Sequence, residues 1–239
     1  KEKNIENIDL LMSDTLSLIN FVKKENIYLT IVGPEGPLVD GIVDEFNRHN
    51  LKIFGPTKKY ALLEGSKVFS KEFMKHYDIP TADYQMFSSA KEAKDFTENK
   101  KHPIVIKADG LAAGKGVVVS LDKDESFVAI DNLLASEHSN HIVVEEFLKG
   151  QELSAIYVCN YKGCSFEIAL PWTKDYKSRD EYNAGPNTGG MGAISHPLCY
   201  EHKNSIFKLQ IDIEKIMIKT ISAINDYNKR ANNGYVGFL

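Results

Sequence analysis

A glycine-rich segment flanked by lysines is the sharpest chemical feature of the sequence. It reads Ile104-Val-Ile-Lys-Ala-Asp-Gly-Leu-Ala-Ala-Gly-Lys-Gly-Val117, with Lys107 on a predicted strand and Lys115 at the loop tip between Gly114 and Gly116. Glycines let backbone N–H groups approach phosphate oxygens closely, and two ammonium groups add positive charge. The segment therefore predicts a triphosphate clamp. The alternative is a Gly/Ala surface turn with a solvated lysine.

The spacing of this segment excludes two common phosphate-binding motifs. Three residues separate Gly110 from Gly114, and Gly116 stands where a P-loop carries the Ser or Thr that holds a metal ion. A dinucleotide-binding fingerprint needs a helix after the loop, whereas a strand is predicted here. The loop is therefore expected to close a β-hairpin over its ligand.

Paired acids end a second apolar strand, at Val143-Val-Glu-Glu-Phe-Leu148, and Glu152 follows shortly after. A carboxylate or a backbone carbonyl can accept a hydrogen bond from the exocyclic amine of adenine, while a backbone N–H donates to the ring. A further glutamate such as Glu152 can hold ribose hydroxyls. Taken alone, the strand would more often be an ordinary sheet edge with solvated acids. Its position after the glycine-rich loop favours an adenine site at Glu145, Glu146, Phe147 and Leu148.

Two other loops are candidates for substrate binding. The run Ala184-Gly-Pro-Asn-Thr-Gly-Gly-Met-Gly-Ala193 has four glycines in ten residues, which we interpret as excluding a regular element. It predicts a loop that binds an anion or substrate through its backbone, with a structural turn as the alternative. Gly33-Pro34-Glu35 follows a predicted strand, where the Glu35 carboxylate can meet a substrate amine or hydroxyl. A simple turn is an equally good interpretation of that second loop.

Metal-binding and nucleophile motifs are not found. The seven histidines and three cysteines show no metal-ligand spacing, and no Ser/His/Asp or Cys/His signature appears. We therefore predict no metal site, packing or surface roles for the histidines, and reduced thiols for the cysteines.

The first part of the chain has the pattern of a parallel sheet. A helix is predicted from Asp14 to Lys24, followed by a strand at 28–32, a helix with Leu38, Ile42 and Phe46 on one face, and a strand at 51–54. Alternating helices and strands of this kind are typical of an α/β fold, which binds ligands at the carboxyl ends of its strands.

The pattern changes to α+β after Thr57. Helices are predicted after Ser66 and after Ser88 or Ser89, and a third at 124–135. The predicted strands cover 103–108, 117–120, 142–146, 153–160 and 165–170, the last two joined by a hairpin turn at 160–163. A loop-rich segment over 171–197 and a long amphipathic helix with apolar positions from Ile206 to Ile224 complete the chain. This part therefore predicts an antiparallel sheet with helices.

Composition excludes several classes of protein. The 239 residues carry 29 Lys and Arg against 33 Asp and Glu, a net charge of −4, which argues against nucleic acid as a partner. No apolar run is long enough to span a membrane, and the first residues do not resemble a signal peptide, so we expect a cytoplasmic protein. The chain ends on an apolar segment predicted as a strand, Tyr235-Val-Gly-Phe-Leu239, and a domain rarely ends this way because the backbone groups of a strand need ladder partners, so we expect a fragment.

In this order, the motifs closely resemble the phosphoribosylamine–glycine ligase family of the ATP-grasp superfamily. The match covers essentially the whole chain through Thr30-Ile-Val-Gly-Pro-Glu35, Leu51 to Thr57, Leu63-Glu-Gly-Ser-Lys67, Ile104 to Val117, Val144 to Leu148 and Gly185 to Gly192. The resemblance implies an α/β and α+β protein. A partial parallel-sheet pre-ATP-grasp domain would cover residues 1–62, and an incomplete ATP-grasp domain would cover 63–239 with an antiparallel-sheet lid at about 103–170.

The resemblance also implies a reaction and its site. The family uses ATP to join glycine to 5-phosphoribosylamine through glycyl phosphate, so no side chain need act as a covalent nucleophile. Lys67 and Lys107 would contact the ATP phosphates, and Gly114-Lys115-Gly116 would fold over them, with Lys107 and Lys115 as the catalytic residues. Glu145 to Leu148 would hold adenine and Glu152 the ribose. The substrate residues would be Gly33, Pro34, Glu35, Asp175, Lys177, Pro186, Asn187, Thr188, Gly189, Gly190, Met191 and Gly192.

The sequence also departs from the family pattern. The family's N-terminal strand and Gly-Gly-Arg-Glu-His motif are missing, and its magnesium-binding acidic segment is expected beyond Leu239. The usual Gln-Asp-His-Lys stretch reads Lys174-Asp-Tyr-Lys177. We therefore expect the chain to be inactive alone, and favour a monomer. The alternatives are another ATP-grasp ligase or carboxylase, or a nucleotide-binding module without catalysis.

Overall fold

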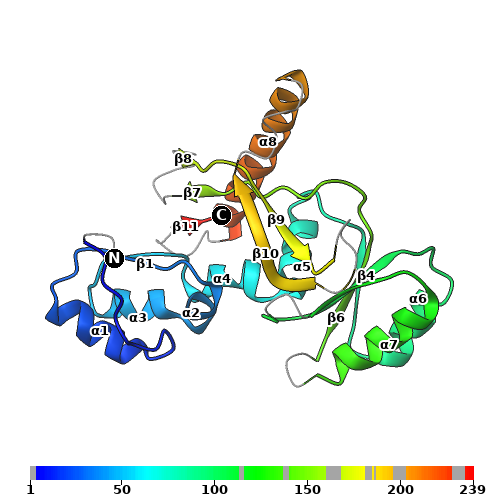
Figure 1. Cartoon of the computed structure of the whole chain (residues 1–239), viewed down its shortest axis with the longest axis horizontal. Coiled ribbons are helices and arrows are strands. Elements are labelled where there is room, and N and C mark those ends of the chain that lie inside the picture. Colours follow the sequence, from blue (N-terminus) through cyan, green and yellow to red (C-terminus); the bar gives the residue numbers. More distant parts are fainter. Residues whose placement is uncertain are drawn as a thin grey trace. The chain divides into compact units, whose positions relative to one another are not determined.

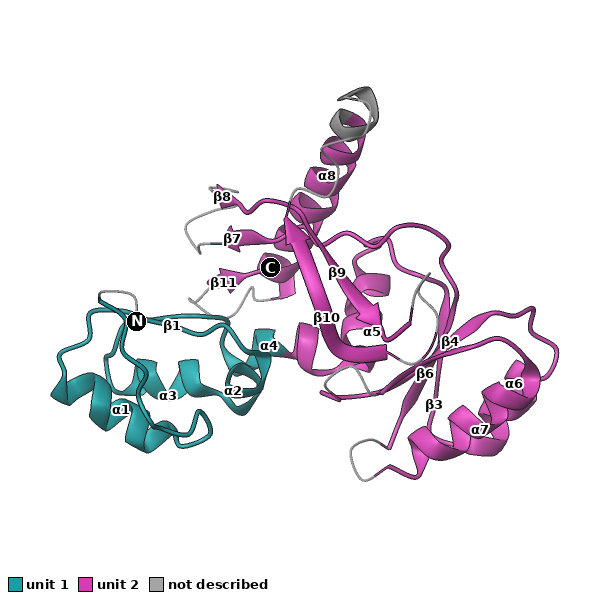
Figure 2. Ribbon diagram, in the orientation of Figure 1, with its two compact units in different colours: residues 1–61 teal, residues 62–239 magenta. Residues whose placement is uncertain are grey.

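The computed structural model describes residues 4–112, 116–136, 140–159, 168–180, 185, 187–195, 203–227 and 235–239. Within these residues the chain divides into two compact units, residues 1–61 and 62–239 (Figure 2). Each unit is described by itself below.

The first unit is a small parallel α/β arrangement. Its two strands pair in parallel, with Thr30 opposite Ile53 and Ile31 opposite Phe54, which confirms the predicted sheet type. Its core consists of Ile19, Val22, Val32, Ile42, Val43 and Phe46. In chain order its elements are α1 (Thr15–Lys24), β1 (Thr30–Ile31), α2 (Glu35–Asp40), α3 (Ile42–Arg48) and β2 (Ile53–Phe54), and α4 (Lys58–Gly65) contains the boundary between the units.

Local signals explain where these elements begin and end. The Asp14 side chain accepts a hydrogen bond from the Ser17 N–H and so caps α1. The helix expected around Leu38 to Phe46 is two helices instead, because Gly41 has φ +100° and ends α2 in a left-handed conformation. Both strands are also shorter than predicted. Helix α4 lies where no helix was predicted.

The second unit contains a four-stranded antiparallel sheet in the order β3-β6-β4-β5. Helices α6 and α7 lie side by side on one face of it (Figure 1). This sheet begins earlier than the segment expected to form the lid, because it includes β3, a strand that was not predicted. Its elements are α5 (Lys67–His76), β3 (Tyr84–Phe87), α6 (Ala90–Thr97), β4 (Ile104–Ala108), β5 (Val117–Ser120), α7 (Lys123–Leu134) and β6 (Ile142–Glu146).

Apolar side chains alternate along the strands of this sheet, so its two faces differ in chemistry. Every second residue of β4 and β6 is apolar and buried against α6 and α7, including Ile104, Ile106, Ile142 and Val144. Side chains of successive residues in a strand point to opposite faces, so Lys107 and Glu145 lie on the other face. The core that holds the sheet together therefore leaves the second face available for charged side chains.

The rest of the unit forms two smaller antiparallel sheets. One has the strand order β11-β7-β8, and the other is the pair β9 and β10. Strands β7 and β8 thus pair with each other, as predicted, but belong to a different sheet from β4 to β6. The turn predicted at 160–163 lies outside the described residues. These elements are β7 (Tyr157–Cys159), β8 (Ile168–Ala169), β9 (Thr173–Ser178), β10 (Asn187–Ser195), α8 (Lys203–Tyr227) and β11 (Gly237–Phe238).

The segment over 171–197 was predicted to be loop-rich but contains two paired strands. The glycine-rich run after Ala184 was expected to exclude a regular element, yet Asn187–Ser195 is a strand paired with Thr173–Ser178. The register shifts between Asn187 and Gly192, where Gly190 and Gly192 have φ values of +129° and +147°. Glycine adopts such backbone angles at little cost, so the irregular part of the strand depends on these residues.

Candidate functional site

A buried carboxylate and two lysines meet on the face of the sheet that lies away from α6 and α7. The carboxylate Oε2 of Glu145 accepts from Lys107 Nζ at 2.9 Å and lies 3.3 Å from Lys71 Nζ. The Glu145 side chain is only 5% exposed, whereas that of Lys107 is 29% exposed. A buried carboxylate needs nearby cations and hydrogen bonds to compensate its charge, and these two lysines supply them to Glu145.

Strand register places these groups together. Lys107 lies opposite Val143, and Glu145 lies opposite Val105, so Lys107 and Glu145 are diagonal neighbours on one face. On the other side of β6, Tyr84 lies opposite Glu145. The predicted strands therefore bring together two of the residues that sequence analysis assigned to nucleotide binding.

The second oxygen of the Glu145 carboxylate has no hydrogen-bond partner in the described structure. This atom, Oε1, is fully buried. A buried acceptor without a donor is unfavourable by about 1–3 kcal/mol, so a ligand that donates a hydrogen bond there would be favoured. The exocyclic amine of adenine is such a donor. The site thus fits an adenine nucleotide in its donor and acceptor chemistry.

Residues after Glu145 present a mixed surface. Glu146 is exposed, and its Oε1 accepts from the Asp83 N–H at 3.0 Å. Phe147 and Leu148 are 38% and 64% exposed despite being apolar. Exposed apolar side chains beside a buried acceptor suit a flat heterocycle, which needs both a packing surface and a hydrogen-bond partner.

The base of the glycine-rich loop is tied to the start of α5. Asp109 Oδ1 accepts from Ser66 Oγ and from the Val68 N–H, both at 3.1 Å, and Lys67 Nζ donates to the Gly110 carbonyl at 2.7 Å. Partial burial lowers the pKa of Lys67, although Asp109 opposes that shift. The ammonium group of Lys67 therefore lies at the start of the loop, beside the backbone that would receive phosphate.

The tip of the loop lies mostly outside the described residues, including Gly114 and Lys115. Gly116 is described, and its carbonyl accepts from the Ala108 N–H at 2.8 Å. A Cβ atom at this position would lie 2.7 Å from Cβ of Ala112. Glycine is therefore required here by close packing of the loop, and β4 and β5 form the expected hairpin.

Glu152 and Lys177 form an ion pair with each other, although sequence analysis assigned them to different ligands. Lys177 also lies 3.5 Å from Asp175. Partial burial disfavours the Lys177 charge, yet the hydrogen bonds and attraction of Glu152 and Asp175 outweigh it and raise the pKa of Lys177. Glu152, Asp175 and Lys177 therefore hold one another in place. They form a second polar cluster, on β9 and on the segment before β7.

The β9–β10 hairpin carries most of the residues assigned to substrate. Thr188 Oγ1 donates to the Lys177 carbonyl at 3.0 Å and accepts from the Gly190 N–H at 3.1 Å. Asn187 and Thr188 are half-buried, and Gly189, Gly190, Met191 and Gly192 are exposed. Pro186 lies outside the described residues. The exposed glycines leave backbone groups accessible on one strand.

Gly33, Pro34 and Glu35 belong to the other unit. They follow β1 after one residue, Val32, and Pro34 is the N-cap residue of α2 while Glu35 is its first helical residue. All three are exposed. The Glu35 carboxylate is thus available to solvent at the carboxyl end of a parallel strand.

The charged residues around this site, Glu145, Lys107, Lys71, Lys67 and Asp109, are called the charge cluster below. Sequence analysis missed two of them. Lys71 is one helical turn from Lys67, and this i, i+4 spacing was a usable signal that both lysines share a helix face. Asp109 directly follows the β4 strand, but its pairing with Ser66 joins residues 43 positions apart. No local pattern predicts a contact of that separation.

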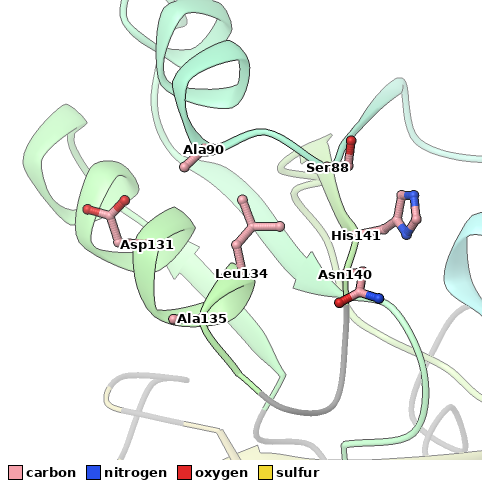
Figure 3. Close-up of a pocket in the computed structure, with 7 residues that line it drawn as sticks. All are labelled: Ser88, Ala90, Asp131, Leu134, Ala135, Asn140 and His141. Carbon is pink, nitrogen blue, oxygen red and sulfur yellow. The ribbon is translucent and has the colours of Figure 1, made fainter.

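A separate surface pocket lies on the α6 and α7 side of the sheet (Figure 3). Its volume is about 530 Å³, and none of the residues predicted for the site lines it. Asp131, at its wall, is paired with Lys94 at 2.6 Å. The lining residues are Ser88, Ala90, Asp131, Leu134, Ala135, Asn140 and His141.

Among the described residues, no group of three or more His, Cys, Asp or Glu side chains is arranged to hold a metal ion. None of the described helices has the length and apolar character needed to cross a membrane.

Comparison with known proteins gives concordant matches for both units. Residues 1–64 match the family described as phosphoribosylglycinamide synthetase, N domain, and residues 65–239 match phosphoribosylglycinamide synthetase, ATP-grasp (A) domain. The sequence is 46% identical over 216 residues to a phosphoribosylamine–glycine ligase of Clostridium acetobutylicum, covering 88% of this chain and 51% of that protein. The chain spans about half the length of the curated relatives it matches.

Solved structures show the same similarity. A phosphoribosylamine–glycine ligase from Thermotoga maritima matches with a TM-score of 0.67 and 34% identity, covering 87% of this chain and 49% of that chain. A carboxyaminoimidazole ribonucleotide synthase from Aspergillus clavatus, solved with ATP, matches with a TM-score of 0.63 and 15% identity, covering 99% of this chain and 54% of that chain. The second match shows a shared fold.

Proposed function

The chain belongs to the phosphoribosylglycinamide synthetase family, and on that premise we propose that it forms the nucleotide-binding part of a ligase that joins glycine to 5-phosphoribosylamine with ATP. The products would be glycinamide ribonucleotide, ADP and phosphate. The observation that carries the proposal is the buried Glu145 carboxylate, which has two lysine partners on one oxygen and no partner on the other.

The residues of the second unit would divide the nucleotide between them. Glu145 Oε1 would accept from the adenine amine, and Phe147 and Leu148 would pack against the base. Lys107, which is partly exposed, and Lys67, at the base of the glycine-rich loop, would meet the phosphates. The Glu152 carboxylate, which is paired with Lys177 in this structure, would release Lys177 and accept hydrogen bonds from the ribose hydroxyl groups. Gly114, Lys115 and Gly116 would complete the phosphate contacts.

Catalysis would then depend on position and charge. When bound, ATP supplies the phosphoryl group that activates the glycine carboxyl group. Charge that develops on the phosphate oxygens would be neutralised by Lys67, Lys107 and Lys115. The glycine-rich loop, folded over the phosphates, would exclude water. Glycine and 5-phosphoribosylamine would be held by the Asn187–Gly192 strand with Asp175 and Lys177, and by Gly33, Pro34 and Glu35. Magnesium would supply further positive charge at the phosphates in the same reaction.

We also propose that the protein works in the cytoplasm. The buried free thiol of Cys159 supports this, because unpaired cysteines are ordinary in a reducing compartment.

Binding of ATP to this chain tests the nucleotide site. Lys107→Met should weaken the affinity for ATP by about ten-fold or more, because a charged hydrogen bond contributes about 1.5–3 kcal/mol. Lys101→Met is the matched control, since Lys101 is an exposed lysine just before β4. Calorimetry measures both variants. Equal losses in the two variants would contradict the assignment of Lys107.

Turnover tests the reaction itself. The whole protein, mixed with ATP, magnesium, glycine and 5-phosphoribosylamine, is expected to give ADP and glycinamide ribonucleotide. ADP formation that requires a different carboxylate or amine would indicate another ATP-grasp ligase. Binding of ATP with no product from any such pair would indicate a nucleotide-binding module.

A further inference from the structure

Lys71 is a buried lysine beside the site that no ligand assignment uses. It lies on α5 and is 6% exposed. Its Nζ donates to Thr81 Oγ1 at 2.7 Å and to the Ala82 carbonyl at 3.3 Å, and lies 3.3 Å from Glu145 Oε2. An ammonium group has three N–H donors, and here three acceptors surround it. All three N–H donors of the Lys71 ammonium group therefore have acceptors within the protein.

The geometry separates the roles of the two lysines. Lys71 and Lys107 meet the same oxygen of Glu145, but the Lys107 side chain is 29% exposed and that of Lys71 is 8% exposed. Lys107 can turn toward a ligand, whereas Lys71 is enclosed by α5, the segment before β3, and β6. Tyr84 adds to this enclosure, because its hydroxyl donates to the Lys71 carbonyl at 3.0 Å and its ring lies 5.3 Å from Nζ.

The charges around Glu145 show why two lysines are needed. If phosphate oxygens attract Lys107 and no second cation is present, the buried carboxylate is left with an uncompensated charge, which is strongly unfavourable. The carboxylate would then retain Lys107 and compete with the phosphates for it. With Lys71 in place, Glu145 remains paired when Lys107 moves, and its Oε1 keeps its orientation.

We propose that Lys71 is a positioning residue that keeps the Glu145 carboxylate paired and oriented, so that Lys107 is free to bind the nucleotide phosphates. This inference rests on the proposed nucleotide site. It assigns Lys71 no contact with ATP: its effect on binding passes entirely through Glu145.

A double-mutant cycle between Lys71 and Glu145 tests this dependence, with ATP affinity measured by calorimetry on the 239-residue chain. Lys71→Met alone should weaken ATP binding by about ten-fold, the size expected for loss of a charged partner. In the Glu145→Gln background, Lys71→Met should have no further effect on ATP affinity, because the carboxylate on which Lys71 acts is gone.

Two control variants separate positioning from general stability. Thr81→Val removes another hydrogen bond of Lys71 but leaves Glu145 untouched, and Lys75→Met removes an exposed charge one turn along α5. Thr81→Val should lower the urea midpoint without changing ATP affinity, and Lys75→Met should change neither. Lys71→Arg should restore part of the affinity lost in Lys71→Met, since it keeps the charge.

The outcomes are distinct. Equal effects of Lys71→Met with and without Glu145→Gln would overturn the positioning role, as would unchanged ATP affinity in a folded Lys71→Met variant. If Lys71→Met alone fails to fold, the comparison of Glu145→Gln with the double variant still decides, and a weaker double variant overturns the proposal. Absence of ATP binding in the unmodified chain overturns the nucleotide site and this role together.

Discussion

At the scale of single residues, the charge cluster shows how burial changes the meaning of a side chain. Glu145 and Lys107 were predicted from their place on two strands, but Lys71 was not, because a lysine in a helix is usually solvated. Its burial follows from contacts with Thr81 and Ala82, which lie beyond the end of α5. Tertiary contacts of this kind cannot be deduced from helix periodicity.

Cys159 offers a residue-scale prediction for the pH dependence of stability. Burial raises the pKa of its thiol from 9.0 to about 11. Between these values the unfolded chain has lost the proton and the folded chain keeps it, so the free energy of unfolding should fall as pH rises, by about 3 kcal/mol at most.

Urea unfolding of the unmodified chain and of Cys159→Ala, measured from pH 8 to pH 11, isolates this contribution. Other groups titrate in the same range, so the quantity to compare is the change with pH in each protein. The decrease should be smaller in Cys159→Ala. Parallel curves for the two proteins would contradict the raised pKa.

At the scale of elements, the predictions succeeded where a local signal sets the boundary. Asp14, Ser66 and Ser89 each cap the helix that follows them, and the apolar alternation of β4 and β6 identified both strands. The β10 strand was missed because its glycines have no side chains to show alternation, and its partner β9 supplies the pairing. Strand β3 was missed because its four residues include the polar Gln85 and only Phe87 is buried, so it shows no apolar run.

The tie between Asp109 and the start of α5 gives an element-scale prediction. Asp109→Ala should lower stability by about 1–2 kcal/mol, because the Val68 N–H and Ser66 hydroxyl lose their acceptor. It should also weaken ATP binding, since Lys67 and Gly110 are held by the same junction.

Asp122→Ala is the matched control for that variant. Asp122 caps α7 by accepting from the Glu125 N–H at 2.9 Å, on the other side of the sheet from the charge cluster. Its loss should lower stability by a similar amount and leave ATP affinity unchanged. Urea unfolding and calorimetry measure the two effects, and a loss of affinity in Asp122→Ala would show that reduced stability alone accounts for both results.

At the scale of the whole molecule, the chain combines two units with different chemistry. Figure 2 shows the two units, residues 1–61 and residues 62–239. The first unit carries the exposed Glu35 at the start of α2, and the second carries the charge cluster and the paired strands β9 and β10. Sequence motifs predicted the fold class of both units. They gave no information on which face of the four-stranded sheet carries the charged side chains, because that depends on the packing of α6 and α7.

The central claim is that nucleotide binds on the face of that sheet carrying Glu145 and Lys107. Hydrogen exchange of the chain with and without ATP, followed by mass spectrometry, measures this most directly. We predict that ATP slows exchange in peptides covering residues 67–71, 104–110 and 145–148, and leaves residues 131–135 at the pocket beside α7 unchanged. Protection at 131–135 without protection at 145–148 would contradict the account.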